Sequence, residues 1–225
     1  LWLHLSPTST EDNLWVDISG NQRSFVNNGA TRIDSQISKS FVSETEYTSF
    51  RKLDGGYRFD SATSSEITLP KPFGYGEATY ILTFSANTLI SNPTRLLSTG
   101  YIANGVLITY SNNDGIELFT NGSSATFGFI PQVDTLYTIA VTMDGTNEKL
   151  FVNGTLVSTK SEGLLAPAST NNMTLGHDDD GGGYHHDGEI KNVRMFNYAL
   201  SDADVKAYSR GAATKWVDRV EAPQV

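Results

Sequence analysis

Short apolar segments with a period of two recur along almost the whole chain. The clearest spans residues 136–143, where Tyr137, Ile139, Val141 and Met143 alternate with small or polar residues. Such alternation predicts a strand with one buried face. Further short apolar segments bounded by turn residues predict strands at 1–5, 56–59, 66–69, 78–84, 95–98, 106–110, 115–119, 126–129, 149–152, 173–175 and 189–196. Many short, regularly spaced strands predict a two-sheet, all-β antiparallel sandwich.

Two turn signals follow the strand at 136–143. Asp144-Gly145 comes directly after it, and Asn153-Gly154 closes the next apolar segment. Asn-Gly adopts the positive φ angles of a two-residue hairpin turn at little cost. This part of the chain therefore predicts an antiparallel hairpin.

One short helix is predicted after Leu200, near the C-terminus. Ser201 can cap the first backbone N–H groups, and Asp202 and Asp204 lie in the positively polarised first turn. Gly211 ends the pattern. We expect this helix to dock on the sandwich.

Length and charge limit the domain count and the expected partners. An all-β chain of 225 residues commonly forms one domain, so we predict one sandwich over 1–210 and a connector over 211–225. The net charge of −9 disfavours nucleic acid and anionic membranes as partners. No apolar run is long enough for membrane insertion, and the absence of cysteine excludes disulfides and a thiol nucleophile.

Three blocks in the last third of the chain carry a family resemblance. They are YTIAVTMDGTNEKLFVNGTLV at 137–157, LGH at 175–177 and DGEIKNVRMFNYALSDADVKAY at 187–208. They resemble laminin G-like domains of the concanavalin A-like lectin/glucanase superfamily. The resemblance implies a jelly roll whose relatives are carbohydrate-binding modules of secreted bacterial proteins, adhesive modules and domains of phage tail fibres.

The segment 177–187 concentrates carboxylates, imidazoles and a tyrosine on a glycine-rich connection between two predicted strands. A sugar site needs an aromatic face for the apolar side of the ring and planar polar groups for its hydroxyls. We therefore predict a ligand site at Asp178, Asp180, Tyr184, His185 and Asp187. The alternative is a solvated acidic turn that binds no ligand.

The same carboxylates suit Ca²⁺, the one cofactor we predict, because calcium takes about six to eight oxygen ligands. Asp179 and Asp180 are the expected ligands in this loop. Asp17 and Asn21 form a second candidate site, whose alternative is an Asx turn that only shapes the chain. A transition-metal site at the loop histidines is less favoured, since no acidic residues are spaced to support them.

Enzymatic activity is not predicted. Laminarinase-like glucanases of this architecture carry Glu-x-Asp-x-x-Glu along one strand, and the chain lacks that motif. The nearest pattern, Glu44-Thr45-Glu46, has no third carboxylate, and no G-x-S-x-G motif occurs. A glycoside hydrolase, the less favoured alternative, would need two carboxyl groups about 5–5.5 or 6.5–9.5 Å apart.

We expect a non-catalytic glycan-binding or adhesion module of a larger extracellular or virion fibre protein. Its ligands would be cell-surface glycans or polysaccharides. The alternative is a structural module that packs against copies of itself, as a homo-oligomer, or against a neighbouring fibre protein, without a small ligand.

Overall fold

A computed structural model of the chain describes residues 29–30, 56–69, 76–100, 105–167, 171–177 and 184–209 in full. It also describes the backbone of four short strands at 3–7, 15–17, 26–28 and 31–33. The predicted connector at 211–225 lies outside these residues.

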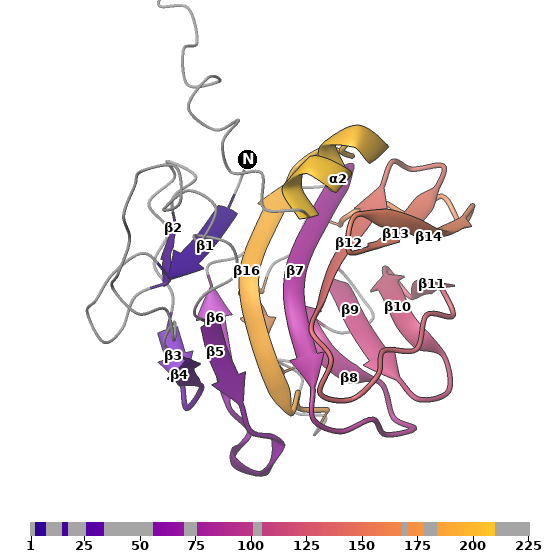
Figure 1. Ribbon diagram of the computed structural model, residues 1–225. Helices are drawn as coiled ribbons and strands as arrows, with labels where there is room; N and C mark the ends of the chain where they lie inside the picture. The colour runs from indigo at the N-terminus through magenta and orange to yellow at the C-terminus, as the bar shows by residue number, and fades with distance from the viewer. Residues whose placement is uncertain are drawn as a thin grey trace, which may run out of the picture.

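The described strands form two antiparallel sheets (Figure 1). The nine-stranded sheet contains, in order, β14 (Thr155–Lys160), β13 (Glu148–Val152), β12 (Tyr137–Met143), β7 (Ala78–Ala86), β16 (Gly188–Phe196), β1 (Leu3–Pro7) and β2 (Trp15–Asp17), while β5 (Gly56–Phe59) pairs with β16 and with β4 (Thr31–Ile33). The seven-stranded sheet contains β11 (Ser123–Thr126), β10 (Gly115–Thr120), β9 (Val106–Ser111), β8 (Thr94–Ser98), β15 (Met173–Leu175), β6 (Glu66–Leu69) and β3 (Val26–Asn28). The predicted all-β sandwich is confirmed.

The main core lies between the two sheets. On β7, Tyr80, Leu82 and Phe84 are at most 1% exposed and belong to the same buried cluster as Ile108 on β9 and Leu118 on β10. The period of two seen in the sequence explains this arrangement, because alternate side chains of a strand point to the same face. Removal of this apolar surface from water is the main stabilising contribution to the fold.

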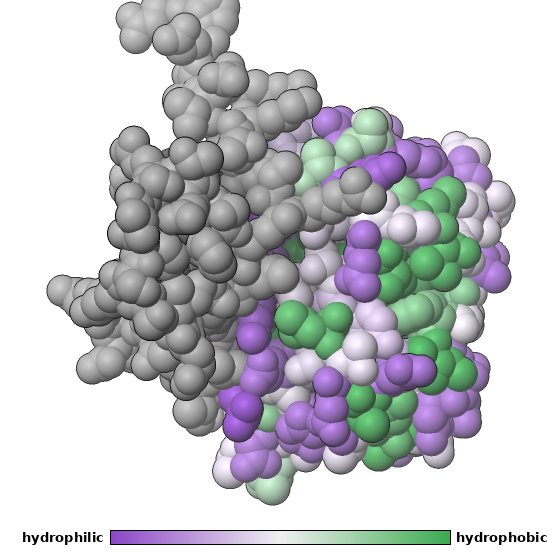
Figure 2. All heavy atoms as spheres, viewed as in Figure 1, coloured by the Kyte–Doolittle hydropathy of each residue, from purple (hydrophilic) through white to green (hydrophobic). Residues whose placement is uncertain are grey.

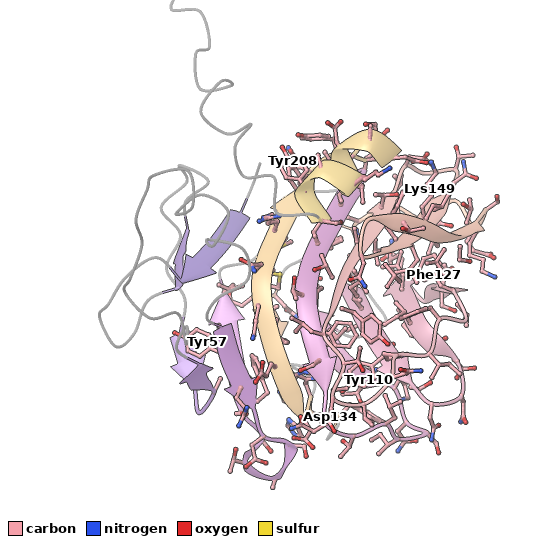
Figure 3. The ribbon with its side chains drawn as sticks, in the orientation of Figure 1. Tyr57, Tyr110, Phe127, Asp134, Lys149 and Tyr208 are labelled. Carbon is pink, nitrogen blue, oxygen red and sulfur yellow. The ribbon has the colours of Figure 1, made fainter. Side chains whose placement is uncertain are left out.

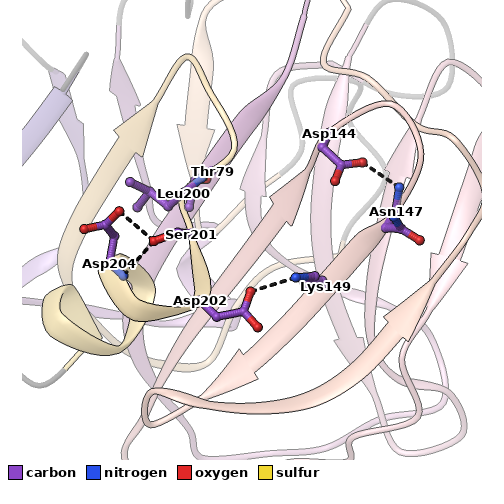
Figure 4. Close-up of polar contacts among 8 residues, drawn as sticks. All are labelled: Thr79, Asp144, Asn147, Lys149, Leu200, Ser201, Asp202 and Asp204. Atoms are coloured by element: carbon purple, nitrogen blue, oxygen red, sulfur yellow. Dashed lines mark hydrogen bonds and ion pairs between the residues drawn. The ribbon is translucent and has the colours of Figure 1, made fainter.

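The predicted hairpin is confirmed. β12 pairs antiparallel with β13, and Asp144 Oδ1 closes the turn between them by accepting from the N–H group of Asn147 at 2.7 Å (Figure 4). The same oxygen accepts from the N–H group of Thr146 at 2.8 Å. Asn153 and Gly154 have φ angles of 51° and 78° and connect β13 to β14. β14 was not predicted because four of its six residues are exposed and its sequence does not alternate.

The strand predicted at 126–129 is wrong in its position. β11 spans Ser123–Thr126, and its pairing with β10 becomes irregular after it: Phe127 N donates to the Ile116 carbonyl at 3.0 Å, and the Phe129 carbonyl accepts from Ile116 N at 2.8 Å. Gly128 adopts a φ of 74°, which bends the chain between two apolar residues. Phe127 is buried and Phe129 packs against the main core, so the apolar pattern arises from a bent segment.

The predicted helix is α2 (Asp202–Ser209), which lies on the outer face of the nine-stranded sheet (Figure 1). Ser201 Oγ accepts from Asp204 N at 3.2 Å, and Lys149 Nζ donates to Asp202 Oδ1 at 2.7 Å (Figure 4). A second apolar cluster lies beneath the helix and comprises Ile81, Ala140, Phe151, Phe196, Leu200, Val205 and Tyr208. Within the described residues, no helix has the length and apolarity of a membrane span.

Candidate functional site

Only part of the predicted ligand site lies in the described region. Asp178, Asp179, Asp180 and Asn21 are outside it. Asp17 ends β2, where the backbone alone is described. The calcium sites therefore stay predictions, and the described part of the loop consists of the residues at its two ends.

Tyr184 is held against β8 by its backbone and by its ring. Its carbonyl oxygen accepts from Arg95 N at 3.0 Å. Its ring centroid lies 4.7 Å from Arg95 Cζ, within the range of a cation–π contact. The Arg95 side chain is fixed in turn by a 3.1 Å hydrogen bond from Nη1 to the Pro93 carbonyl. The half-buried tyrosine is thus preorganised beside the seven-stranded sheet.

Arg95 begins a line of polar residues across four adjacent strands. The strand register places Arg95 opposite Thr109, Thr109 opposite Glu117, and Glu117 opposite Thr126. We call these four residues the polar row. Their neighbours along the strands, including Ile108, Ile116 and Leu118, belong to the core, so the row lies on the outer face of the sheet.

The polar row is strongly desolvated. Arg95 is 3% exposed and Glu117 is 7% exposed. Thr126 Oγ1 donates to Glu117 Oε1 at 2.7 Å, whereas the buried Thr109 Oγ1 has no hydrogen-bond partner among the described residues. Thr109 is 0% exposed, so a buried water would satisfy this hydroxyl, and a ligand atom could not reach it.

Burial raises the pKa of the Glu117 carboxyl, and the negative charge of Asp114 raises it further. The hydrogen bond from Thr126 and the positive charge of Arg95 act in the opposite direction. Glu117 and Arg95 thus partly compensate each other's charge within the row.

A second aromatic side chain lies close to the row. Phe119 follows Glu117 by two residues on β10 and therefore projects from the same face, about 7 Å further along the strand. It is half-buried and pairs with Leu107 and Ser124 on the adjacent strands. The outer face thus carries a polar row with Tyr184 at its Arg95 end and Phe119 beside Glu117.

His185 stacks on His177 at the two ends of the loop. Their ring centroids are 4.1 Å apart and the rings are inclined by only 5°. His177 Nδ1 lies 2.8 Å from Glu66 Oε2, which connects the pair to β6. Burial and the neighbouring His177 lower the pKa of His185, and Glu66 opposes this shift. The stack holds the two ends of the loop together.

His186 is an interior residue. It is fully buried, and its Nδ1 lies 3.0 Å from the Tyr110 hydroxyl. Its backbone N–H donates to the Gly176 carbonyl at 2.7 Å. Burial lowers the pKa of His186 to about 4. No group of three or more His, Cys, Asp or Glu side chains able to hold a metal ion occurs in the described part of the chain.

Asp187 connects the loop to the end of β7. Its Oδ1 accepts from Asn87 Nδ2 at 3.0 Å, and its carbonyl accepts from Asn87 N at 2.8 Å. The structure therefore brings Tyr184 to the polar row but engages His185 and Asp187 in contacts that hold the loop. The polar row was missed in the sequence, where the available signal was a charged residue inside an apolar strand at Arg95 and Glu117.

The family follows from a sequence profile. The laminin G profile described as the concanavalin A-like lectin/glucanases superfamily matches residues 60–206. The chain belongs to this superfamily. The match covers the β12–β13 hairpin, every strand of the seven-stranded sheet except β3, and most of α2. No curated protein sequence matches the chain.

Several solved structures are similar to the chain. Domain 4 of AbnA, a GH43 extracellular arabinanase from Geobacillus stearothermophilus solved with arabinotriose, has a TM-score of 0.68 and 14% identity, over 93% of this chain and 98% of that one. The receptor-binding domain of botulinum neurotoxin type G has a TM-score of 0.64 and 16% identity over 92% of this chain, which spans about half (50%) of the toxin domain. The CBM40 of the Ruminococcus gnavus IT-sialidase, solved with alpha2,3 sialyllactose, has a TM-score of 0.51 and 19% identity, over 60% of this chain and 83% of that one. At these identities the similarity shows a shared fold.

Proposed function

We propose that this chain is a non-catalytic glycan-binding module, displayed outside the cell as part of a larger protein. The observation that carries the proposal is the polar row with its two aromatic neighbours, Tyr184 and Phe119, on the outer face of a sheet. Family membership supports it, as do the oligosaccharides bound to two proteins of similar fold.

The chemistry of the outer face suits a sugar. Aromatic faces pack against the C–H groups of a sugar ring, and carboxylate, guanidinium and hydroxyl groups bind its hydroxyls. Tyr184 and Phe119 supply the first kind of contact. Glu117, which is 7% exposed, supplies the second.

The charges favour a neutral glycan. Arg95 and Glu117 compensate each other within the row, and the whole chain carries a net charge of −9. The negative net charge would repel a sulfated or sialylated glycan at long range. At the row, the positive charge of Arg95 is already compensated by Glu117 and would not offset this repulsion. Calcium bound by Asp179 and Asp180 would enlarge the site toward the loop and is part of the proposal.

The composition of the polar row also supports a module without catalytic activity. Glycoside hydrolases of most families use two carboxyl groups. The polar row contains one, Glu117, and a 2.7 Å hydrogen bond from Thr126 already engages it. A row of this composition can bind and orient a sugar.

A glycan array tests the proposal. The domain is multimerised, because open sites bind weakly and avidity compensates for this. We expect wild-type binding to neutral glycans, with Tyr184→Ala and Glu117→Gln each reducing it at least about tenfold, a loss typical of a central binding residue. Tyr198→Ala is the matched control, because Tyr198 is a 41% exposed aromatic residue beside α2, away from the row.

The calcium part of the proposal is tested by repeating the array in EGTA. Loss of binding in EGTA and in Asp180→Ala would support an ion at the loop. Retention in EGTA would leave the polar row as the whole site. Absence of binding by the folded protein under both conditions would contradict glycan recognition and favour a self-assembling structural module.

A further inference from the structure

Two hairpin turns of the sandwich have the same sequence and nearly the same backbone conformation. Asn121-Gly122 connects β10 to β11, and Asn153-Gly154 connects β13 to β14. The φ angles are 52° and 79° in the first turn, and 51° and 78° in the second. Any difference in chemical reactivity between the two turns must therefore come from their surroundings.

An Asn-Gly pair can react with itself. The glycine backbone nitrogen attacks the asparagine Cγ, so that a nitrogen–Cγ bond forms, the Cγ–Nδ2 bond breaks and Nδ2 leaves as ammonia with the proton from the glycine N–H. Water then opens the cyclic succinimide at either carbonyl, which gives aspartate or isoaspartate. Glycine permits this attack because it has no Cβ to hinder it. The two reacting groups must rotate toward each other, so a firmly held turn reacts slowly.

The surrounding structure holds Asn153 at its side chain and at its backbone. Its Oδ1 accepts from Thr138 N at 2.9 Å, and its own N–H donates to the Thr138 carbonyl at 2.7 Å. Both contacts join the turn to β12 in the interior of the nine-stranded sheet. The electrophilic side-chain carbon and the adjacent backbone are therefore fixed.

Helix α2 covers the glycine of the same turn. Gly154 is buried, and a Cβ added to it would lie 3.4 Å from Ser209 Cβ and 3.5 Å from Lys206 Cα. The helix is fixed to β13 by the 2.7 Å ion pair between Lys149, labelled in Figure 3, and Asp202. Figure 2 shows hydrophilic surface on the solvent side of α2, as expected of a helix whose opposite side packs on the sheet. The nucleophilic nitrogen of Gly154 is thus held as well.

The turn at Asn121 lies in a different environment. Residues 121–124 are all exposed. They begin β11, a strand of four residues at the end of the seven-stranded sheet. Thr120 holds the chain before the turn, because its Oγ1 donates to the Leu165 carbonyl at 2.8 Å. Solvent-exposed backbone at the edge of a sheet opens locally at a low cost in free energy.

We propose that Asn121 is a site of spontaneous deamidation, whereas the fold protects Asn153 in a turn of the same sequence and conformation. The reaction replaces an amide by a carboxylate and changes the net charge from −9 to −10. Isoaspartate also adds one backbone atom to the turn between β10 and β11. This inference is independent of the proposed glycan-binding function.

Peptide mapping tests the inference. The folded full chain is incubated at mildly alkaline pH in ¹⁸O-labelled water, so that deamidation during incubation is distinguished from deamidation during digestion. Tandem mass spectrometry then quantifies both turns in the same digest. We expect Asn121 to deamidate at least about tenfold faster than Asn153, because local opening of the exposed turn is less costly.

Two controls assign the difference to the fold. In urea, where neither turn is held, the two rates should agree within about twofold. In Asn121→Gln the main acidic species seen by ion-exchange chromatography should be lost, because glutamine forms the corresponding six-membered ring far more slowly. Circular dichroism verifies that this variant is folded.

Three outcomes would overturn the inference. Similar rates at both turns in the folded protein would show that the contacts of Asn153 and Gly154 give no protection. A folded protein that is unreactive at Asn121, although the chain in urea reacts there, would show that the exposed turn is protected as well. An acidic species that persists unchanged in Asn121→Gln would place the main site elsewhere in the chain.

Discussion

At the scale of single residues, His186 shows how the fold changes the chemistry of a side chain. It follows His185 in the sequence, yet its ring lies in the core, 5.7 Å from the ring of Phe59 and 6.3 Å from that of Phe84. Burial disfavours the charged imidazolium and lowers the pKa of His186 from its usual value of 6.5 to about 4.

This shift predicts a loss of stability in acid. Above pH 6.5 the imidazole is neutral in both the folded and the unfolded chain, so its full contribution is present. As the pH falls from 6.5 to about 4, the unfolded chain binds a proton that the folded chain does not. The free energy of unfolding should decrease by about 3 kcal/mol over this interval. Urea unfolding at several pH values measures it.

His186→Phe is the control for this prediction. Phenylalanine suits the aromatic surroundings and cannot titrate, although the loss of the Tyr110 contact should cost about 1 kcal/mol at neutral pH. The variant should lose less stability between pH 6.5 and 4 than the wild type. Identical pH profiles would assign the acid sensitivity to other groups.

At the scale of elements, one buried carboxylate holds a connecting segment in place. Glu148 on β13 is 0% exposed, and its two oxygens accept from the N–H groups of Glu162 and Leu164, at 3.0 and 2.5 Å. Further along the same segment, the Leu165 carbonyl accepts from Thr120 Oγ1 on β10 at 2.8 Å. The segment therefore connects β13 of one sheet to β10 of the other.

Replacement of this carboxylate should destabilise the protein. In Glu148→Gln one acceptor becomes an N–H₂ group that faces a backbone N–H donor, so a buried donor loses its partner. We expect the free energy of unfolding to fall by about 2 kcal/mol. Glu162→Gln is the matched control because the Glu162 side chain is exposed, and it should change stability by less than about 0.5 kcal/mol. Chemical denaturation measures both, and equal effects would contradict the assigned role.

At the scale of the whole molecule, the net charge of −9 surrounds the sandwich with a negative field. We predict that the protein is not retained by a heparin column at low ionic strength, because heparin is a polyanion. We also predict that affinity for a neutral glycan changes by less than about twofold between about 50 and 300 mM salt. An uncharged ligand has no net electrostatic attraction to the protein that salt could screen. Retention on heparin would show a basic surface that the overall charge conceals.

Most of the fold could be predicted from the sequence. The alternation at Tyr137, Ile139 and Val141 identifies a half-buried strand locally, because side-chain direction depends only on strand geometry. The cap at Ser201 and the turn at Asn153-Gly154 were found for the same reason, since each needs only adjacent residues. β14 was not predicted, because this edge strand is largely exposed and lacks an apolar alternation. The position of β11 was not predicted, because the bend at Gly128 places apolar residues of a non-strand segment in a strand-like pattern.

The candidate site depended on the tertiary structure. Arg95, Thr109, Glu117 and Thr126 lie on four different strands, and no local pattern relates them. Strand register aligns them, and the sequence does not reveal register before the strands are paired. Likewise, the loop composition identified Tyr184, His185 and Asp187 as candidates. Only the folded chain showed that Tyr184 reaches Arg95 while the other two hold the loop. The sequence by itself determined the strands, turns, helix and charge, because these are local or additive properties. The tertiary structure decided which polar groups share a face, because that depends on contacts between distant segments.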